Sequence, residues 1–134
     1  MKIAAITDDG KTISQHFGRA PYYIVVTIED GKITHSEMRD KLGHAQFQVE
    51  GKDDEQHDGK QPHGYGPAAE DRHNRMAEAI GDCEVLLCRG MGMGAFESMK
   101  ARNIFPVVTD IVNVEEAVLV YANGQIVNHV EKLH

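Results

Sequence analysis

An Asp-Gly pair between two strand-like runs is the feature that most constrains the fold of this chain. Residues 22–29 are rich in β-branched and aromatic side chains, and residues 32–39 follow Asp30-Gly31 as the returning run. Asp-Gly at this spacing is among the strongest short-range signals for a hairpin with a type I′ turn. Favourable cross-strand pairs would follow from that turn: Glu29 with Lys32, Ile28 with Ile33, and Thr27 with Thr34. The sequence therefore predicts an antiparallel hairpin.

The other elements alternate between strand and helix patterns. The runs with strand character are 2–7, 84–88, 105–109 and a short final run at 125–130. Helical spacing of apolar residues occurs over 69–80, after a glycine-rich turn up to about residue 102, and from 114, where Asn113 and Glu116 form an N-cap signature. Strand–helix–strand units with right-handed crossovers give parallel pairing. We therefore predict the α/β class, with a mixed five-stranded sheet and helices on both faces.

One stretch departs from this regularity. Residues 41–67 contain five glycines and two prolines among charged and amide residues, without hydrophobic periodicity. A chain of 134 residues fits a single domain. We expect residues 1–134 to form one domain that carries a mobile loop at 41–67.

Charge and composition exclude several classes of partner. The formal net charge is −7 and no run of Lys and Arg occurs, so a nucleic-acid partner is not expected. No apolar run approaches the roughly 18 residues that a membrane span needs, so no membrane partner is expected either. The first residues are too short an apolar run for a signal peptide, which makes the cytoplasm the expected location. Cys83 and Cys88 should then be free thiols.

Chemically useful residues follow the predicted parallel strands. Ligands bind beyond the carboxyl ends of the strands in open α/β sheets. His16 lies in the loop after the first strand, Cys88 and Arg89 close the next, and Asp110 follows the third, whereas Cys83 begins its strand at the other end. A thiolate is a soft ligand, and we expect a helix N-terminus and Arg89 to lower the pKa of Cys88. Amides of the turn at Gly90, Gly92 and Gly94 could cradle an anion. Cys88 as ordinary core filling is the competing interpretation.

Two alternative functions stay open. The spacing Gly90-x-Gly92-x-x-Ala95 after a strand resembles a dinucleotide fingerprint, with Asp110 as the acidic ribose partner, so a nucleotide-binding or redox module using Gly90–Gly94 is one alternative. A zinc-binding regulatory protein is the other, using the histidines in and after the long loop: His44, His57, His63 and His73. Their spacing matches no standard zinc pattern, and His73 lies on the apolar side of its helix.

Two segments resemble a known family. The string Asp9-Gly10-Lys11 through His16-Phe17-Gly18-Arg19-Ala20-Pro21-Tyr22-Tyr23 and the turn Arg89–Phe96 are similar to the dinitrogenase iron–molybdenum cofactor family, and the likeness covers nearly the whole chain outside 41–67. The resemblance implies a ribonuclease H-like fold without nuclease chemistry, and no convincing acidic catalytic set occurs. It implies a non-enzymatic protein that binds, stores or carries an iron–molybdenum or related metal–sulfur cluster, with a cluster-donating or cluster-accepting protein as a further partner.

The residues assigned to that role come from both segments. His16 is the position carried over from the family-like loop, as a metal ligand. Cys88 is the second metal ligand that we predict, and four residues of the following turn are predicted to contact the cluster: Arg89, Gly90, Gly92 and Gly94.

Overall fold

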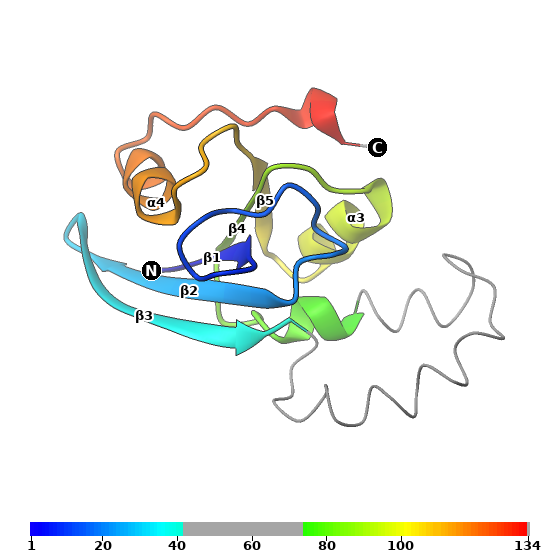
Figure 1. Ribbon diagram of the computed structural model, residues 1–134, viewed down its shortest axis with the longest axis horizontal. Coiled ribbons are helices and arrows are strands. Elements are labelled where there is room, and N and C mark those ends of the chain that lie inside the picture. The colour runs from blue at the N-terminus through cyan, green and yellow to red at the C-terminus, as the bar shows by residue number, and fades with distance from the viewer. Residues whose placement is uncertain (42–73, 134) are drawn as a thin grey trace, which may run out of the picture.

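The computed structural model describes residues 1–41 and 74–133, which form one five-stranded sheet with flanking helices (Figure 1). In chain order the elements are β1 (Lys2–Thr7), β2 (Tyr22–Glu29), β3 (Lys32–Asp40), β4 (Val85–Cys88), α3 (Met93–Ala101), β5 (Phe105–Val108), α4 (Val114–Ala122) and the 3-10 helix η1 (Val130–Lys132). Residues 74–78 add a short helical segment ahead of β4. The predicted mixed α/β sheet is confirmed.

Strand direction decides which loops meet. The order across the sheet is β3-β2-β1-β4-β5, with β2 antiparallel to both neighbours and β4 and β5 parallel to β1. Among these five strands β2 alone runs the opposite way, so the carboxyl ends of β1, β3, β4 and β5 share one edge. Figure 1 shows α3 and α4 on opposite sides of the sheet.

The hairpin forms at the predicted turn. Asp30 and Gly31 have φ angles of 55° and 77°, the positive values that a type I′ turn requires. The predicted pairs of Glu29 with Lys32 and Ile28 with Ile33 are confirmed, but Thr27 faces His35 rather than Thr34. A bulge at this point adds one residue to β3, and the Thr34 hydroxyl donates to the Thr27 carbonyl at 3.4 Å.

The predicted final strand at 125–130 is wrong. These residues lie along the outer side of β5, but they do not form a regular series of backbone hydrogen bonds with it. The Val108 N–H donates instead to a side chain, Asn128 Oδ1, at 2.9 Å. The next residue donates its own N–H to the Val108 carbonyl at 2.7 Å. Because an amide side chain occupies the position of a strand carbonyl, the segment covers the edge without becoming a strand.

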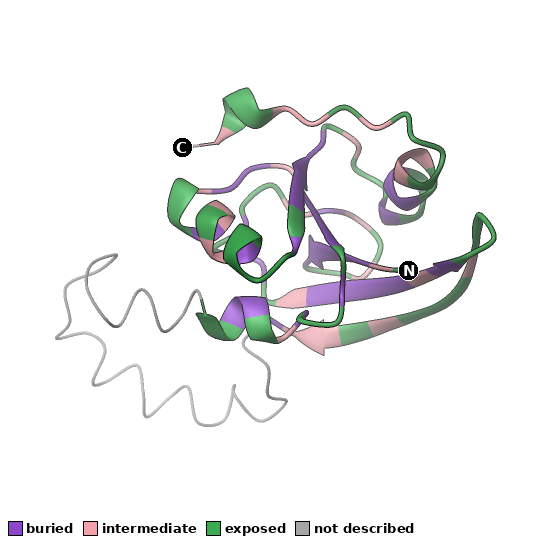
Figure 2. Ribbon diagram, turned by 180° about the vertical axis from the view of Figure 1, so that it is seen from behind, coloured by how far each residue is buried: buried purple, intermediate pink, exposed green. Residues whose placement is uncertain are grey.

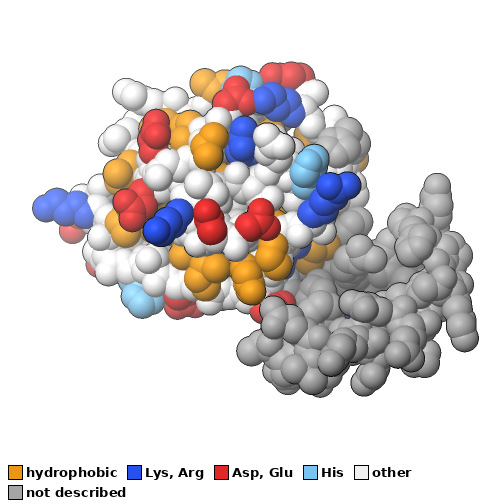
Figure 3. Space-filling view, in the orientation of Figure 1, with side chains coloured by type: hydrophobic (Ala, Val, Ile, Leu, Met, Phe, Trp, Pro, Cys, Tyr) orange, Lys and Arg blue, Asp and Glu red, His pale blue; other side chains and the backbone are white. Residues whose placement is uncertain are grey.

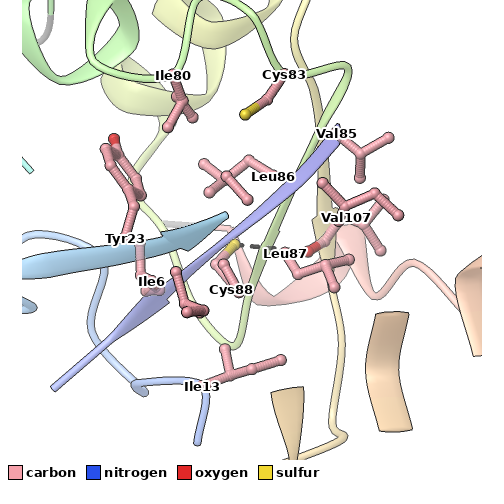
Figure 4. Packing of buried hydrophobic residues seen from close by; sticks show 14 of the residues in the cluster. Ile6, Ile13, Tyr23, Ile80, Cys83, Val85, Leu86, Leu87, Cys88 and Val107 are labelled. Carbon is pink, nitrogen blue, oxygen red and sulfur yellow. Dashed lines mark hydrogen bonds between the residues drawn. The ribbon is translucent and has the colours of Figure 1, made fainter. Parts of the chain in front are cut away.

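Around β4 both faces of the sheet are apolar and buried. Leu86 and Cys88 point to the side that carries Tyr23 and Ile80, and alternate β4 residues point to the other side (Figure 4). The Tyr23 hydroxyl donates to the Met76 carbonyl at 2.8 Å, which fixes the 74–78 segment on its face of the sheet. Of the predicted helix over 69–80, residues 74–78 are observed as helix.

Several predictions fall on residues outside those described. The segment 41–67, apart from Lys41, belongs to this part of the chain, as do the four histidines of the zinc alternative, His44, His57, His63 and His73. None of the helices in the described part is long and apolar enough to cross a bilayer.

Candidate functional site

The loop after β1 is held in shape by a carboxylate. Asp9 Oδ1 accepts the backbone N–H groups of Lys11 and Thr12, each at 2.9 Å. These two hydrogen bonds lower the pKa of Asp9 to about 2, and the bond from Lys11 has the larger effect. Thr7 completes the turn, since its hydroxyl accepts from the Gly10 N–H at 2.8 Å and donates to the Thr12 carbonyl at 2.7 Å. The loop therefore leaves the sheet in a defined conformation.

Backbone hydrogen bonds then carry this loop across the carboxyl edge. The Ile13 N–H donates to Val112 O at 2.7 Å, ahead of α4, and the Ser14 N–H donates back to Ile6 O of β1 at 3.0 Å. The Phe17 N–H donates to Gly90 O at 3.3 Å. This last bond joins the loop to the turn that follows β4, and it places His16 beside that turn.

Gly90 makes the junction possible. A Cβ atom at this position would lie 2.9 Å from the Gln15 carbonyl oxygen, closer than such contacts normally allow. The two loops thus pack backbone against backbone, which only glycine permits here.

A small open cleft of about 190 Å³ lies at this junction. His16, Gly90 and Gly92, all predicted as site residues from the sequence, line it together with four residues that were not predicted as site residues: Phe17, Gly18, Arg19 and Met91. The side chains of His16 and Arg19 are exposed, whereas Phe17 and Met91 are buried and form the base. Topology therefore brings an imidazole, a guanidinium and the glycine turn to one place.

The start of α3 contributes main-chain donors. Gly92 is the N-cap in an extended conformation, with no side-chain cap and no acidic residue in the first helical turn. The first N–H groups of a helix have no partner within the helix, and the dipole makes this end positive. Gly94 lies in that first turn and is exposed. The cleft is therefore suited to a negatively charged guest.

Cys88 lies under this edge but does not line the cleft. Its side chain is 0 % exposed, and its Sγ faces the Val107 carbonyl oxygen at 3.7 Å in the core (Figure 4). Burial raises the pKa of the thiol to about 12, and an opposing backbone hydrogen bond from Gly90 is weaker. The expectation of a lowered pKa is wrong, because the loss of hydration outweighs the field of the helix terminus. Cys83 is also free and buried, with a pKa raised to about 12 chiefly by burial.

Asp110 and Arg89 form a separate group beside the cleft. The exposed Asp110 carboxylate accepts a hydrogen bond from Lys132 and lies 3.1 Å from His129 Nε2. The hydrogen bond from Lys132 is the largest cause that lowers the pKa of Asp110, and the charge of Arg89 lowers it by a smaller amount. The acid that the nucleotide alternative requires is thus already paired with the chain's own cations.

Sequence reasoning missed a second cation near the cleft. Lys41 is 4 % exposed, donates to the Phe17 carbonyl, and lies with its Nζ 4.4 Å from the centre of the Phe17 ring. The sheet order explains its place: β2 lies between β3 and β1 and is antiparallel to both, so the end of β3 reaches the same edge as the end of β1. Arg19 was visible in the sequence, within the His16–Arg19 string, but without an assigned role.

The donor set favours an anionic guest over a bare metal ion. Within residues 1–41 and 74–133 no three His, Cys, Asp or Glu side chains are grouped as a metal ion would need. Acidic and basic side chains are interspersed on the face shown in Figure 3, with no single broad basic field there. A guest at the cleft would meet one imidazole, one guanidinium and main-chain N–H groups, which suit a guest that carries its own negative charge.

Comparison with known proteins gives a consistent picture. The model of the family described as dinitrogenase iron–molybdenum cofactor matches residues 1–124. The fold is similar to the crystal structure of PH0822 (TM-score 0.65, 18 % identity, 96 % of each chain covered). It is also similar to the apo orange protein from Desulfovibrio gigas (TM-score 0.62, 20 % identity, covering 95 % of this chain and 91 % of that one). No curated protein matches the sequence.

Proposed function

The chain belongs to the dinitrogenase iron–molybdenum cofactor family, and we propose that it binds and carries an iron–molybdenum or related metal–sulfur cluster in the cleft between the His16 loop and the glycine turn. The observation that carries this proposal is the joint exposure of His16 and Arg19 next to the uncapped start of α3. The role is non-catalytic: the cluster is cargo and leaves unchanged.

The proposed contacts divide by chemistry. His16 supplies one neutral nitrogen ligand, a donor that many transition metals accept. Arg19 and the N–H groups near Gly92 and Gly94 offset the negative charge of the sulfides through charge-assisted hydrogen bonds. Arg89, which does not line the cleft, would contribute through its field at longer range. A site with one ligating side chain binds less tightly than a chelating one, and that suits a carrier that must hand its cargo on.

Cys88 has a weaker case as a ligand. Its thiol is fully buried and its pKa is raised, so binding would require both exposure and loss of a proton. We therefore assign the ligand role to His16 and keep Cys88 as a prediction that mutation can test.

Three further assignments belong to the same proposal. A cluster-donating or cluster-accepting protein would be the partner, since a carrier needs a source and a destination. We propose the cytoplasm as the location of this chain, a reducing compartment in which both cysteines stay thiols. The strand order, with β2 as the antiparallel member of the described sheet, supports assignment to the ribonuclease H-like class.

Anaerobic reconstitution with iron, sulfide and molybdate tests the proposal. Bound metals are quantified after gel filtration, together with the visible absorption of the cluster. We expect the wild type to retain a chromophore, His16→Ala to lose at least about nine tenths of it, and Arg19→Ala to lose a smaller part. His35→Ala is the matched control, because His35 is an exposed histidine on β3 and does not line the cleft.

Two outcomes would count against this assignment. Equal cluster content in the wild type and His16→Ala would remove the cleft as the site. A loss in Cys88→Ala as large as in His16→Ala, with both variants folded, would restore the thiol as a ligand. Calorimetric titration with NAD and ATP addresses the nucleotide alternative, and saturable micromolar binding would favour it. Zinc titration of the full chain against a variant lacking residues 41–67 addresses the regulatory alternative.

A further inference from the structure

The two outer strands of the sheet, β5 and β3, differ in what covers their open sides. β5 has Pro106 within the strand, and the Asn128 side chain and the His129 backbone bond to its outer edge. β3, at the other edge, has neighbours on one side only among the residues that the structure describes. An uncovered edge strand offers a row of N–H and C=O groups to another strand.

The length and composition of β3 favour pairing. Its nine residues contain no proline and span about 30 Å at roughly 3.4 Å per residue. Most of the strand is exposed or half-buried, in contrast to the buried β2 beside it (Figure 2). Among the features that block edge pairing, β3 is neither short nor interrupted by proline, although it carries charged side chains and the bulge at Thr34.

We propose that β3 is a self-association surface, pairing antiparallel with β3 of a second copy of this chain about a two-fold axis at Ser36. In this register Lys32 of each copy faces Asp40 of the other, and His35 faces Glu37. A two-fold axis repeats each contact, so both cross-strand charge pairs occur twice. Thr34 faces Met38, and no like charges are opposed.

Two neighbouring registers are less favourable. A slip of one residue in one direction sets Lys32 against Arg39, and a slip of two in the other direction sets Glu37 against its own copy. Like charges directly opposite destabilise a strand pair. The charge sequence of β3 is thus complementary to itself in the register centred at Ser36.

The dimer should be weak. Each copy has a formal net charge of −7, which opposes association at long range, and one strand pair buries less area than a stable interface does. Salt at about 0.15 M shortens the Debye length to roughly 8 Å, so the net repulsion is screened more than direct contacts. We expect a dissociation constant on the order of micromolar.

Sedimentation velocity across a concentration series tests the proposal. The wild type should shift from monomer to dimer, and Lys32→Glu should raise the dissociation constant at least about tenfold by opposing two carboxylates. Adding Asp40→Lys to that variant should restore association, because the pair is then reversed. Lys100→Glu, which changes the net charge equally on exposed α3, is the control and should behave as the wild type.

A wild type that stays monomeric at about 1 mM would overturn the proposal, as would unchanged association in Lys32→Glu. If that variant fails to fold, hydrogen exchange of the wild type at low and high concentration decides the matter. Protection of β3 amides that rises with concentration supports the edge pairing, and protection that does not change refutes it.

Discussion

The loop of residues 8–20 and strand β4 reach the same edge of the sheet and differ in what they expose there. The loop is held by backbone hydrogen bonds to β1, the segment before α4 and the glycine turn, and it leaves His16 and Arg19 exposed. β4 ends at the same edge with its thiol wholly inside the core. Topology determines which residues come near one another, but burial determines which of them a ligand can touch, and all four residues of β4 are buried.

This contrast predicts that β4 controls stability and the loop controls binding. Leu86→Ala should give the largest loss of stability, because Leu86 is fully buried on the face of the sheet that Cys88 shares. Truncation of a buried leucine costs about 2–5 kcal/mol, depending on how far the cavity collapses. Urea unfolding followed by circular dichroism measures the change. A loss below about 1 kcal/mol would contradict the packing described for β4.

Gly90→Ala tests the junction between the two regions. A methyl group would meet the Gln15 carbonyl oxygen at 2.9 Å, a backbone atom that cannot move without shifting the loop. We expect a loss of about 1–3 kcal/mol and a lower cluster content, since the loop that bears His16 is displaced. Gly81→Ala is the control, because Gly81 does not line the cleft and a Cβ atom there would make only an ordinary contact, 3.5 Å from the Glu78 carbonyl oxygen. Equal behaviour of the two variants would show that the close approach is unimportant.

Thiol labelling tests whether Cys88, unlike the exposed residues of the cleft, is inaccessible in the folded protein. With pKa values raised to about 12 by burial, neither Cys88 nor Cys83 should react with a thiol reagent at pH 8 until the protein unfolds. The labelling rate should follow unfolding, and Cys88→Ala should cost about 1 kcal/mol through the small cavity it leaves. Rapid labelling of Cys88 in the folded protein would make the thiol accessible and reopen its role as a ligand.

Much of the sheet was predictable because local signals agree with the tertiary arrangement. The Asp30-Gly31 turn, the β-branched runs and the Asn113 N-cap each act over a few residues, and the Asn113 side chain does accept the Glu116 N–H at 2.8 Å. The bulge opposite Thr27 and the side-chain pairing of Asn128 with β5 depend on contacts between distant segments, which no local pattern encodes.

The site was predictable in location and not in detail. The rule that ligands bind at the carboxyl ends of parallel strands selected His16 and the glycine turn. It could not show that β4 is buried on both faces up to its last residue, so it included Cys88. It also omitted Lys41, because the direction of β3 relative to β1 is known only once β2 lies between them.

The Asp9 turn makes the stability of the folded state depend on pH. The pKa of Asp9 is lowered to about 2 by the backbone N–H groups of Lys11 and Thr12, below the ordinary value of 3.8. A lowered pKa in the folded state adds stability above the ordinary value, and this contribution is lost as the pH falls from about 4 towards 2. Wild-type stability should therefore fall more steeply over this range than that of Asp9→Asn. Asp8→Asn is the control, and parallel curves for the wild type and Asp9→Asn would refute the assignment.

His16→Ala should have the smallest effect on stability and the largest on cargo. The side chain is exposed, and the loop is held by main-chain groups on either side of it, so the free energy of unfolding should change by less than about 0.5 kcal/mol. Cluster content should nevertheless fall as stated above, because the one imidazole that lines the cleft among the described residues is gone. Unfolding curves and metal analysis on the same preparation separate the two effects. A variant that loses stability and cargo together would mean that His16 supports the loop, and the division of labour between the loop and β4 would then fail.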